Sequence, residues 1–313
     1  MVETLEQTRR QDPLSTELLV NSTKRYLSGT EHRIQLDELF AQQAERLINA
    51  LEGETFSPNG PWSIDTLRVR IKQYEALTEP LARMVGVLGR WGDAEHPIVV
   101  DIIRSICRQA ENTQDGINHY LDIRSYPAVL IFTAYGLGLA RSERWGDLHR
   151  FFTSDLSLNY PDHPVWMVEG LFLWRWRGGN RDLWNDIKGD PDQRYHTPLS
   201  DWLANVFREW GKSFLGVPPD YDLLFDKFEL LASLAHFGSR EISDVKEELQ
   251  TPRRTFVSAP VGRVGWNSTT NKKLFAELQA DPTRKPLLDA GFAHGSSEFI
   301  DLYMQHLRTF RLY

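Results

Sequence analysis

The tetrapeptide Arg-Trp-Gly-Asp occurs twice in this chain, at residues 90–93 and 144–147, each time between two apolar runs. Around the second copy, residues such as Leu137 end one helical stripe, and Leu148 and Phe151 begin the next. This pattern predicts two helix-turn-helix corners in which tryptophan is wedged between the helices. Such corners build packed helical layers, so they direct the chain towards an α-helical fold.

Helical spacing of apolar residues continues along most of the chain. The clearest helix starts are Ser63, Thr197-Pro198 and Asp220, because these residue types favour the first positions of a helix. Pro80 lies within the run that follows Ser63, so we expect a kink or a break there, at a cost of about 3 kcal/mol if the helix continues. Residues 165–176 are apolar on nearly every side, and we predict that they form the central helix.

These patterns predict an all-α fold, an irregular multi-helix array of helical hairpins with a short loop or extended segment near residues 254–267. We expect residues 1–313 to form a single helical domain. Its subregions are an N-terminal helical hairpin at 1–60, a helical array at 61–250 and a basic C-terminal segment at 251–313. No strands alternate with helices, so a parallel sheet is not expected.

Composition limits the class of protein. The 313 residues include ten tryptophans and a single cysteine, Cys107, which we interpret as a small buried apolar residue. No apolar run reaches the roughly 18 residues of a membrane span, and residues 1–12 lack a signal-peptide core. We therefore expect a cytoplasmic protein without membrane contact.

The basic residues of the C-terminal segment are candidates for binding. The net charge is −7, but residues 251–313 carry nine Lys and Arg against five Asp and Glu. The candidate binding residues are Arg253, Arg254, Arg263, Lys272 and Lys273. A solvated surface and a nucleic-acid contact are both open interpretations of this cluster. The acidic remainder of the chain argues against general nucleic-acid affinity.

Three aspartates raise a catalytic alternative. Asp220, Asp222 and Asp226 lie among aromatic residues, and helical toroid glycosidases use two carboxylates in an aromatic-lined cleft. Asp222 and Asp226 would share a helix face. The other interpretation is that acidic residues near a helix start are stabilised by the helix dipole. A cleft with two of these carboxylates would favour catalysis, and their burial as partners within the fold would argue against it.

Two further motifs have structural interpretations. Gly136 and Gly138 lack the third glycine of a dinucleotide loop, so close helix packing explains them better. Ser296 or Ser297 fits the start of the last helix. The histidines never occur four residues apart on a helix. We expect no metal and no cofactor, and binding rather than catalysis.

Several short phrases together carry a resemblance to a known group of proteins. They are Tyr74–Leu81 before the first corner, Leu137–Ala140 before the second, Leu224–Glu229, Ala259–Arg263 with Trp266, and Gly295–Phe299. These phrases resemble the helical C-terminal region of bacterial antiphage-defence proteins that carry a sirtuin-like or related N-terminal effector domain.

The resemblance implies a role in sensing a trigger or mediating assembly. The glycine-rich NAD-binding domain of that group is absent from this sequence, so NAD consumption is not carried over. The leading hypothesis is a non-enzymatic helical sensor or scaffold that recognises a partner protein in antiphage defence. Its oligomeric state stays open, and the toroid-type hydrolase is the alternative.

Overall fold

The protein is all-α, as the sequence predicts. The computed structural model describes residues 13–93, 97–112, 115–156, 165–190, 192–217, 220–250, 259–266 and 268–310. Within these ranges no strand is present, and the only extended pairing is an isolated antiparallel bridge between Asp155 and Trp166. One hydrophobic cluster extends from Val20 to Leu307.

Helices follow one another with short connections. The helices of the first half are α2 (Pro13–Leu27), α3 (Arg33–Leu51), α4 (Ile64–Trp91), α5 (Pro97–Glu111), α6 (Asn118–Asp122), α7 (Tyr126–Arg141) and α8 (Trp145–Phe152). Those of the second half are α9 (Met167–Leu171), α10 (Arg181–Lys188), α11 (Pro198–Trp210), α12 (Tyr221–Phe237), α13 (Ile242–Gln250), α14 (Ser268–Gln279), α15 (Asp281–Asp289) and α16 (Ser297–Phe310).

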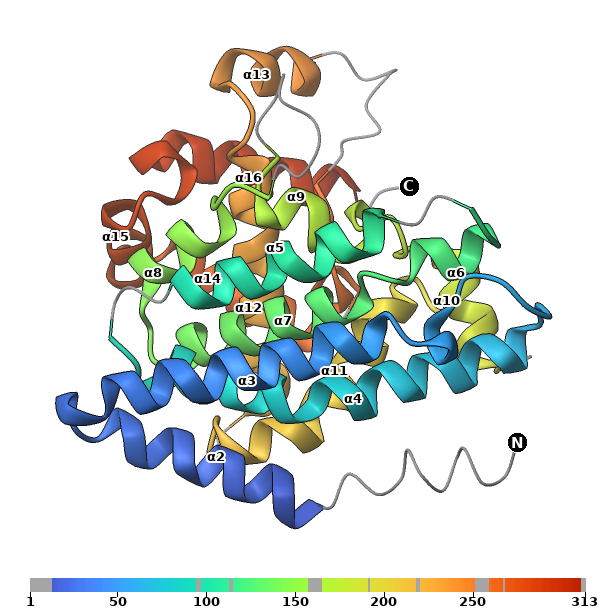
Figure 1. Cartoon of the computed structure of the whole chain (residues 1–313). Helices are drawn as coiled ribbons and strands as arrows, with labels where there is room; N and C mark the ends of the chain where they lie inside the picture. Colours follow the sequence, from blue (N-terminus) through green and yellow to red (C-terminus); the bar gives the residue numbers. More distant parts are fainter. Residues whose placement is uncertain are drawn as a thin grey trace.

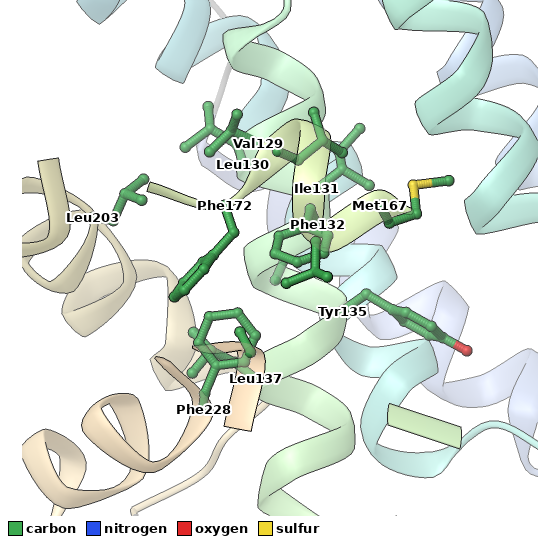
Figure 2. Packing of buried hydrophobic residues seen from close by; sticks show 14 of the residues in the cluster. Val129, Leu130, Ile131, Phe132, Tyr135, Leu137, Met167, Phe172, Leu203 and Phe228 are labelled. Atoms are coloured by element: carbon green, nitrogen blue, oxygen red, sulfur yellow. The ribbon is translucent and has the colours of Figure 1, made fainter. Parts of the chain in front are cut away.

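The central helix is α7, and our prediction of a central helix at residues 165–176 is wrong. Every residue of α7 from Tyr126 to Ala140 is buried, with α4 and α12 packed against it (Figure 1). The stretch Asn118–Arg141 is apolar and long enough to span a membrane by composition, but 94% of its window is buried within the protein. Figure 2 shows Phe172 and Phe228 converging on this helix.

The helix predicted at 165–176 is interrupted by its backbone. The extended backbone of Phe172 (φ −95°, ψ 120°) ends the short helix α9, and Leu173, with a left-handed φ of 47°, begins a 3₁₀ turn. The segment therefore supplies separate apolar side chains to the core, among them Met167 and Phe172 (Figure 2). Apolar composition alone does not distinguish this broken segment from a continuous buried helix.

Helices α4 and α7 make the most extensive helix contact in the described part of the chain. Glycines allow their backbones to approach: a Cβ on Gly138 would lie 2.5 Å from the Gly86 carbonyl oxygen and 3.0 Å from the Arg90 nitrogen. A Cβ on Gly89 would likewise meet the Tyr135 carbonyl oxygen at 2.6 Å. The interpretation of Gly138 as a close-packing residue is therefore confirmed.

The two Arg-Trp-Gly-Asp corners bind one another. Helix α4 ends at the first copy, and α7 and α8 meet at the second, as predicted. Arg144 of the second copy donates hydrogen bonds to the carbonyl oxygens of Gly89, Gly92 and Asp93, at 3.2, 2.6 and 2.8 Å. Its Nε also contacts Asp147 at 2.7 Å. These bonds satisfy carbonyl groups at the end of α4 that have no partner within the helix.

The expectation for the tryptophan of the first corner is wrong. Trp91 is not a wedge, since 47% of it is exposed, and Arg144 joins the corners instead. Of the kink or break expected at Pro80, in the interior of α4, the break does not occur, because the helix continues from Ile64 to Trp91. Pro80 and Leu81 are buried in the core, and this packing offsets the lost backbone hydrogen bond.

Candidate functional site

The three aspartates singled out in the sequence lie at the start of α12 and bind neighbouring groups. The Asp220 side chain accepts a hydrogen bond from the Leu223 backbone at 3.0 Å and so caps the helix. Asp226 is fully buried and accepts from Arg263 Nε at 2.7 Å and from Thr270 Oγ1 at 2.6 Å. Asp222 also binds Arg263, so the two carboxylates share one guanidinium.

Burial and Arg263 act against each other on the ionisation of this cluster. Burial raises the pKa of Asp226 despite its hydrogen bonds from Thr270 and Arg263. Partial burial opposes ionisation of Asp222, but hydrogen bonds from Arg263 and Arg208 outweigh it and lower the pKa of this carboxyl. Burial opposes the charge of Arg263, yet Asp226 and Asp222 raise its pKa above the usual value. The cluster is an internal ion-pair network that joins α12 to α14 through residues 259–266. Burial of Asp226 as a partner within the fold argues against a catalytic carboxylate pair here.

Sequence reasoning missed Glu229, the most perturbed carboxyl of this region. Its side chain is buried, and burial raises its pKa to about 8. Ser200 Oγ donates to Glu229 at 2.8 Å and accepts from the Arg263 backbone N–H at 2.9 Å. The sequence does place Glu229 on the same helix face as Asp222 and Asp226, because it follows Asp226 by three residues. Only the tertiary structure shows that it is enclosed.

The candidate binding residues of the C-terminal segment do not share one environment. Arg253 and Arg254 lie outside the described residues. The Arg263 side chain is mostly buried and engaged by two aspartates, so it offers no free charge to a ligand. Lys272 and Lys273 are exposed on α14.

A hollow in the surface lies beside the start of α4. Its volume is about 620 Å³, and its wall includes Trp62, His119 of α6, Asp182 and Asp186 of α10, and Asp190 just after α10. We call these five residues the acidic hollow. Trp62 is 46% exposed, and its ring centroid lies 5.3 Å from that of His119. An aromatic wall facing carboxylates suits a ligand with both apolar and cationic groups.

Arg194 shows what the acidic hollow accommodates. Its guanidinium contacts Asp182 at 3.3 Å and Asp186 at 3.7 Å, and the Arg194 side chain remains 64% exposed. One arginine against three aspartates leaves the hollow negative. The sequence signal was the spacing of Asp182 and Asp186, four residues apart, which places both on one face of α10. Asp190 follows the left-handed Gly189 that ends this helix.

A second hollow, of about 460 Å³, has a buried carboxylate at its floor. Glu75 accepts hydrogen bonds from Trp202 Nε1 at 2.6 Å, from Lys72 at 2.7 Å and from the Tyr126 hydroxyl at 3.2 Å. Burial, and then Glu75, raise the pKa of Tyr126 well above its usual value. These contacts satisfy the carboxylate internally, so we assign Glu75 a structural role.

The described residues contain no cluster of side chains suited to hold a metal ion, since no group of three or more His, Cys, Asp or Glu side chains there is placed to do so. Burial raises the pKa of the Cys107 thiol to about 12, which disfavours the reactive thiolate. Gly136 packs against Phe228, in agreement with its interpretation as a packing residue.

Comparisons with known proteins do not add an assignment. No protein-family model, curated protein or solved structure matches the chain. The candidate site therefore depends on the geometry of the acidic hollow alone.

Proposed function

We propose that this protein is a non-enzymatic recognition module that binds a positively charged segment of a partner protein in the acidic hollow. The observation that carries the proposal is the combination of a half-exposed tryptophan with three aspartates around one hollow. The indole binds the aliphatic stem of a lysine or arginine, and the carboxylates bind its charged end.

The state of the other acidic groups supports this choice of site. Asp226 and Glu75 are buried and hydrogen-bonded within the protein. By contrast, Asp182 is 83% exposed, and Arg194, which forms an ion pair with it, is 64% exposed. A bound cationic residue displaces Arg194 at little cost, because exposed ion pairs contribute at most about 1 kcal/mol.

Calorimetric titration of peptides tests the proposal. A panel combines lysine or arginine with aliphatic or aromatic neighbours, and matched peptides replace the cations with glutamine. We expect cationic peptides to bind, with weaker binding at high salt. Trp62→Ala combined with Asp186→Asn should reduce the affinity at least tenfold, which corresponds to about 1.4 kcal/mol.

The matched control is Trp174→Ala, because Trp174 is 44% exposed and does not line the hollow. This variant should bind as the wild type does. Equal binding of cationic and glutamine peptides, or unchanged binding by the Trp62 variant, would contradict the proposal.

The proposed biological setting is bacterial antiphage defence. Only the short phrases Tyr74–Leu81 and Leu224–Glu229, with the others quoted above, support this setting. Plating of phage on cells that carry the wild-type gene or the Trp62→Ala, Asp186→Asn variant tests it. Protection by the wild type alone is the expected result, and equal plaque numbers would contradict the setting.

A further inference from the structure

An exposed patch of basic and aromatic residues lies at the C-terminal end of α4, and the acidic hollow lies at the N-terminal end of this helix. Trp91 is 47% exposed, with Arg90 stacked on its ring at 4.4 Å and Lys24 of α2 above the ring at 5.5 Å. Gly216 lies beside the Arg90 guanidinium, and the next residue, Val217, is 94% exposed. We call Lys24, Arg90, Trp91 and Val217 the tryptophan knob.

The backbone around the tryptophan knob is held in place. Arg90 Nη1 donates to the Phe214 carbonyl oxygen at 2.7 Å, and Arg141 Nε donates to that of Leu215 at 3.3 Å. Partial burial, and then Arg141, lower the pKa of Arg90. Half-exposed aromatic rings flanked by cations are typical of anchors in protein interfaces.

The knob and the hollow are complementary in charge. The knob carries Lys24 and Arg90 around the exposed Trp91, and the hollow carries Asp182, Asp186 and Asp190 beside Trp62. They lie just beyond the two ends of α4, whose 28 residues span about 42 Å. In Figure 1, α6 and α10, which line the hollow, lie near the end where α4 begins.

We infer that the tryptophan knob of one molecule binds in the acidic hollow of a second copy, so that the chain assembles head to tail along the direction of α4. This inference depends on the proposed recognition function, because it identifies the occupant of the hollow. Two different surfaces meet in such a contact, so every assembly keeps one free knob and one free hollow unless it closes into a ring.

Three protein samples test the inference by sedimentation velocity over a concentration series. The knob variant combines Lys24→Glu with Trp91→Ala, and the hollow variant combines Asp182→Lys with Trp62→Ala. We expect the average mass of the wild type to increase with concentration at low salt and to fall towards the monomer at high salt. Each variant alone should stay at the monomer mass.

The mixture of the two variants is the decisive sample. The knob variant keeps an intact hollow and the hollow variant keeps an intact knob, so together they should form a dimer of twice the monomer mass and grow no further. A control with Trp174→Ala and Lys273→Glu, both outside the two surfaces, should assemble as the wild type does. Circular dichroism and thermal unfolding confirm that each variant is folded.

Three outcomes would overturn the inference: a wild type that stays monomeric at every concentration and salt, assembly that survives in either variant, or a mixture that stays monomeric. A monomeric wild type that still binds cationic peptides would leave the proposed function in place and remove self-assembly alone. Loss of both would remove the hollow as a recognition site.

Discussion

Single buried polar side chains decide much of the chemistry of this protein. Glu229 is enclosed by the Ser200 hydroxyl, the ion pair of Asp226 with Arg263 and the nearby Asp201, and burial raises its pKa to about 8. The carboxyl is therefore largely protonated at neutral pH. Because the carboxyl of Glu229 is neutral, it adds no third negative charge to the two aspartates, Asp222 and Asp226, that Arg263 already pairs with.

Replacing Glu229 by glutamine should remove a pH dependence of stability. The folded-state pKa lies above the ordinary value of 4.5, so the stabilisation from the protonated form is complete below about pH 4.5 and is lost as the pH rises through about 8. Relative to the wild type, the Gln variant should gain free energy of unfolding over this range, by at most about 1.4 kcal/mol per pH unit.

Urea unfolding at a series of pH values measures this difference. Glu45→Gln is the matched control, because Glu45 is exposed on α3. Its stability should follow that of the wild type between pH 5 and pH 9. Parallel curves for the wild type and the Glu229 variant would show that the carboxyl is ionised in the folded protein.

At the scale of elements, the contact of α4 with α7 depends on glycine. A Cβ on residue 138 would lie only 2.5 Å from the carbonyl oxygen of Gly86. Both α4 and α7 also contact several other helices. Cores of this density have no space for an added methyl group between two backbones.

Gly138→Ala should lower the free energy of unfolding by about 1 to 3 kcal/mol, because the added carbon forces α4 and α7 apart. Gly146→Ala is the matched control, since the Gly146 position in α8 has no other heavy atom within 4 Å of its Cβ. Alanine there should be neutral, or stabilising by up to about 1 kcal/mol. Chemical denaturation of both variants decides, and equal stability would contradict the close approach.

Helix positions were predictable where the signal is local. Ser63 caps α4 with its own hydroxyl, Pro198 begins α11 and Asp220 caps α12, as their residue types indicate. The central position of α7 was not predictable, because residues 165–176 are as apolar as α7. The two segments differ in backbone conformation, with a left-handed residue at Leu173. Burial in a multi-helix protein depends on partners far away in sequence.

The candidate site was predictable only in part. The spacing of Asp182 and Asp186 marks an acidic helix face, but nothing in the sequence places Trp62 and His119 beside it. The same limit applies to Arg263. Its position in a basic segment suggested that it lies on the surface. In the structure it binds Asp226 of α12, which is 37 residues earlier in the sequence.

At the scale of the whole molecule, Arg263 connects residues 259–310 to the body of the protein. It binds α12 through Asp222 and Asp226, and Thr270 at the start of α14 completes the shell around Asp226. Residues 259–266 thus lie between two helices that they hold together.

Arg263→Met should destabilise this region by about 3 to 5 kcal/mol, because it leaves the buried Asp226 without its cation. Hydrogen exchange should increase first in α14 and α16, and later in α4 and α7. Adding Asp226→Asn should restore part of the protection, while Lys273→Met, at an exposed position, should change nothing. A uniform increase over all helices would contradict a local tether.

The contacts of the two Arg-Trp-Gly-Asp corners also distinguish this fold from a regular helical repeat. In a solenoid, each unit offers its successor the surface that it received from its predecessor. Here Arg144 of the second copy donates to the carbonyl oxygens that end α4, whereas Arg90 of the first copy donates to the Phe214 carbonyl oxygen. The two copies therefore make different contacts, and the corner does not act as the unit of a regular repeat.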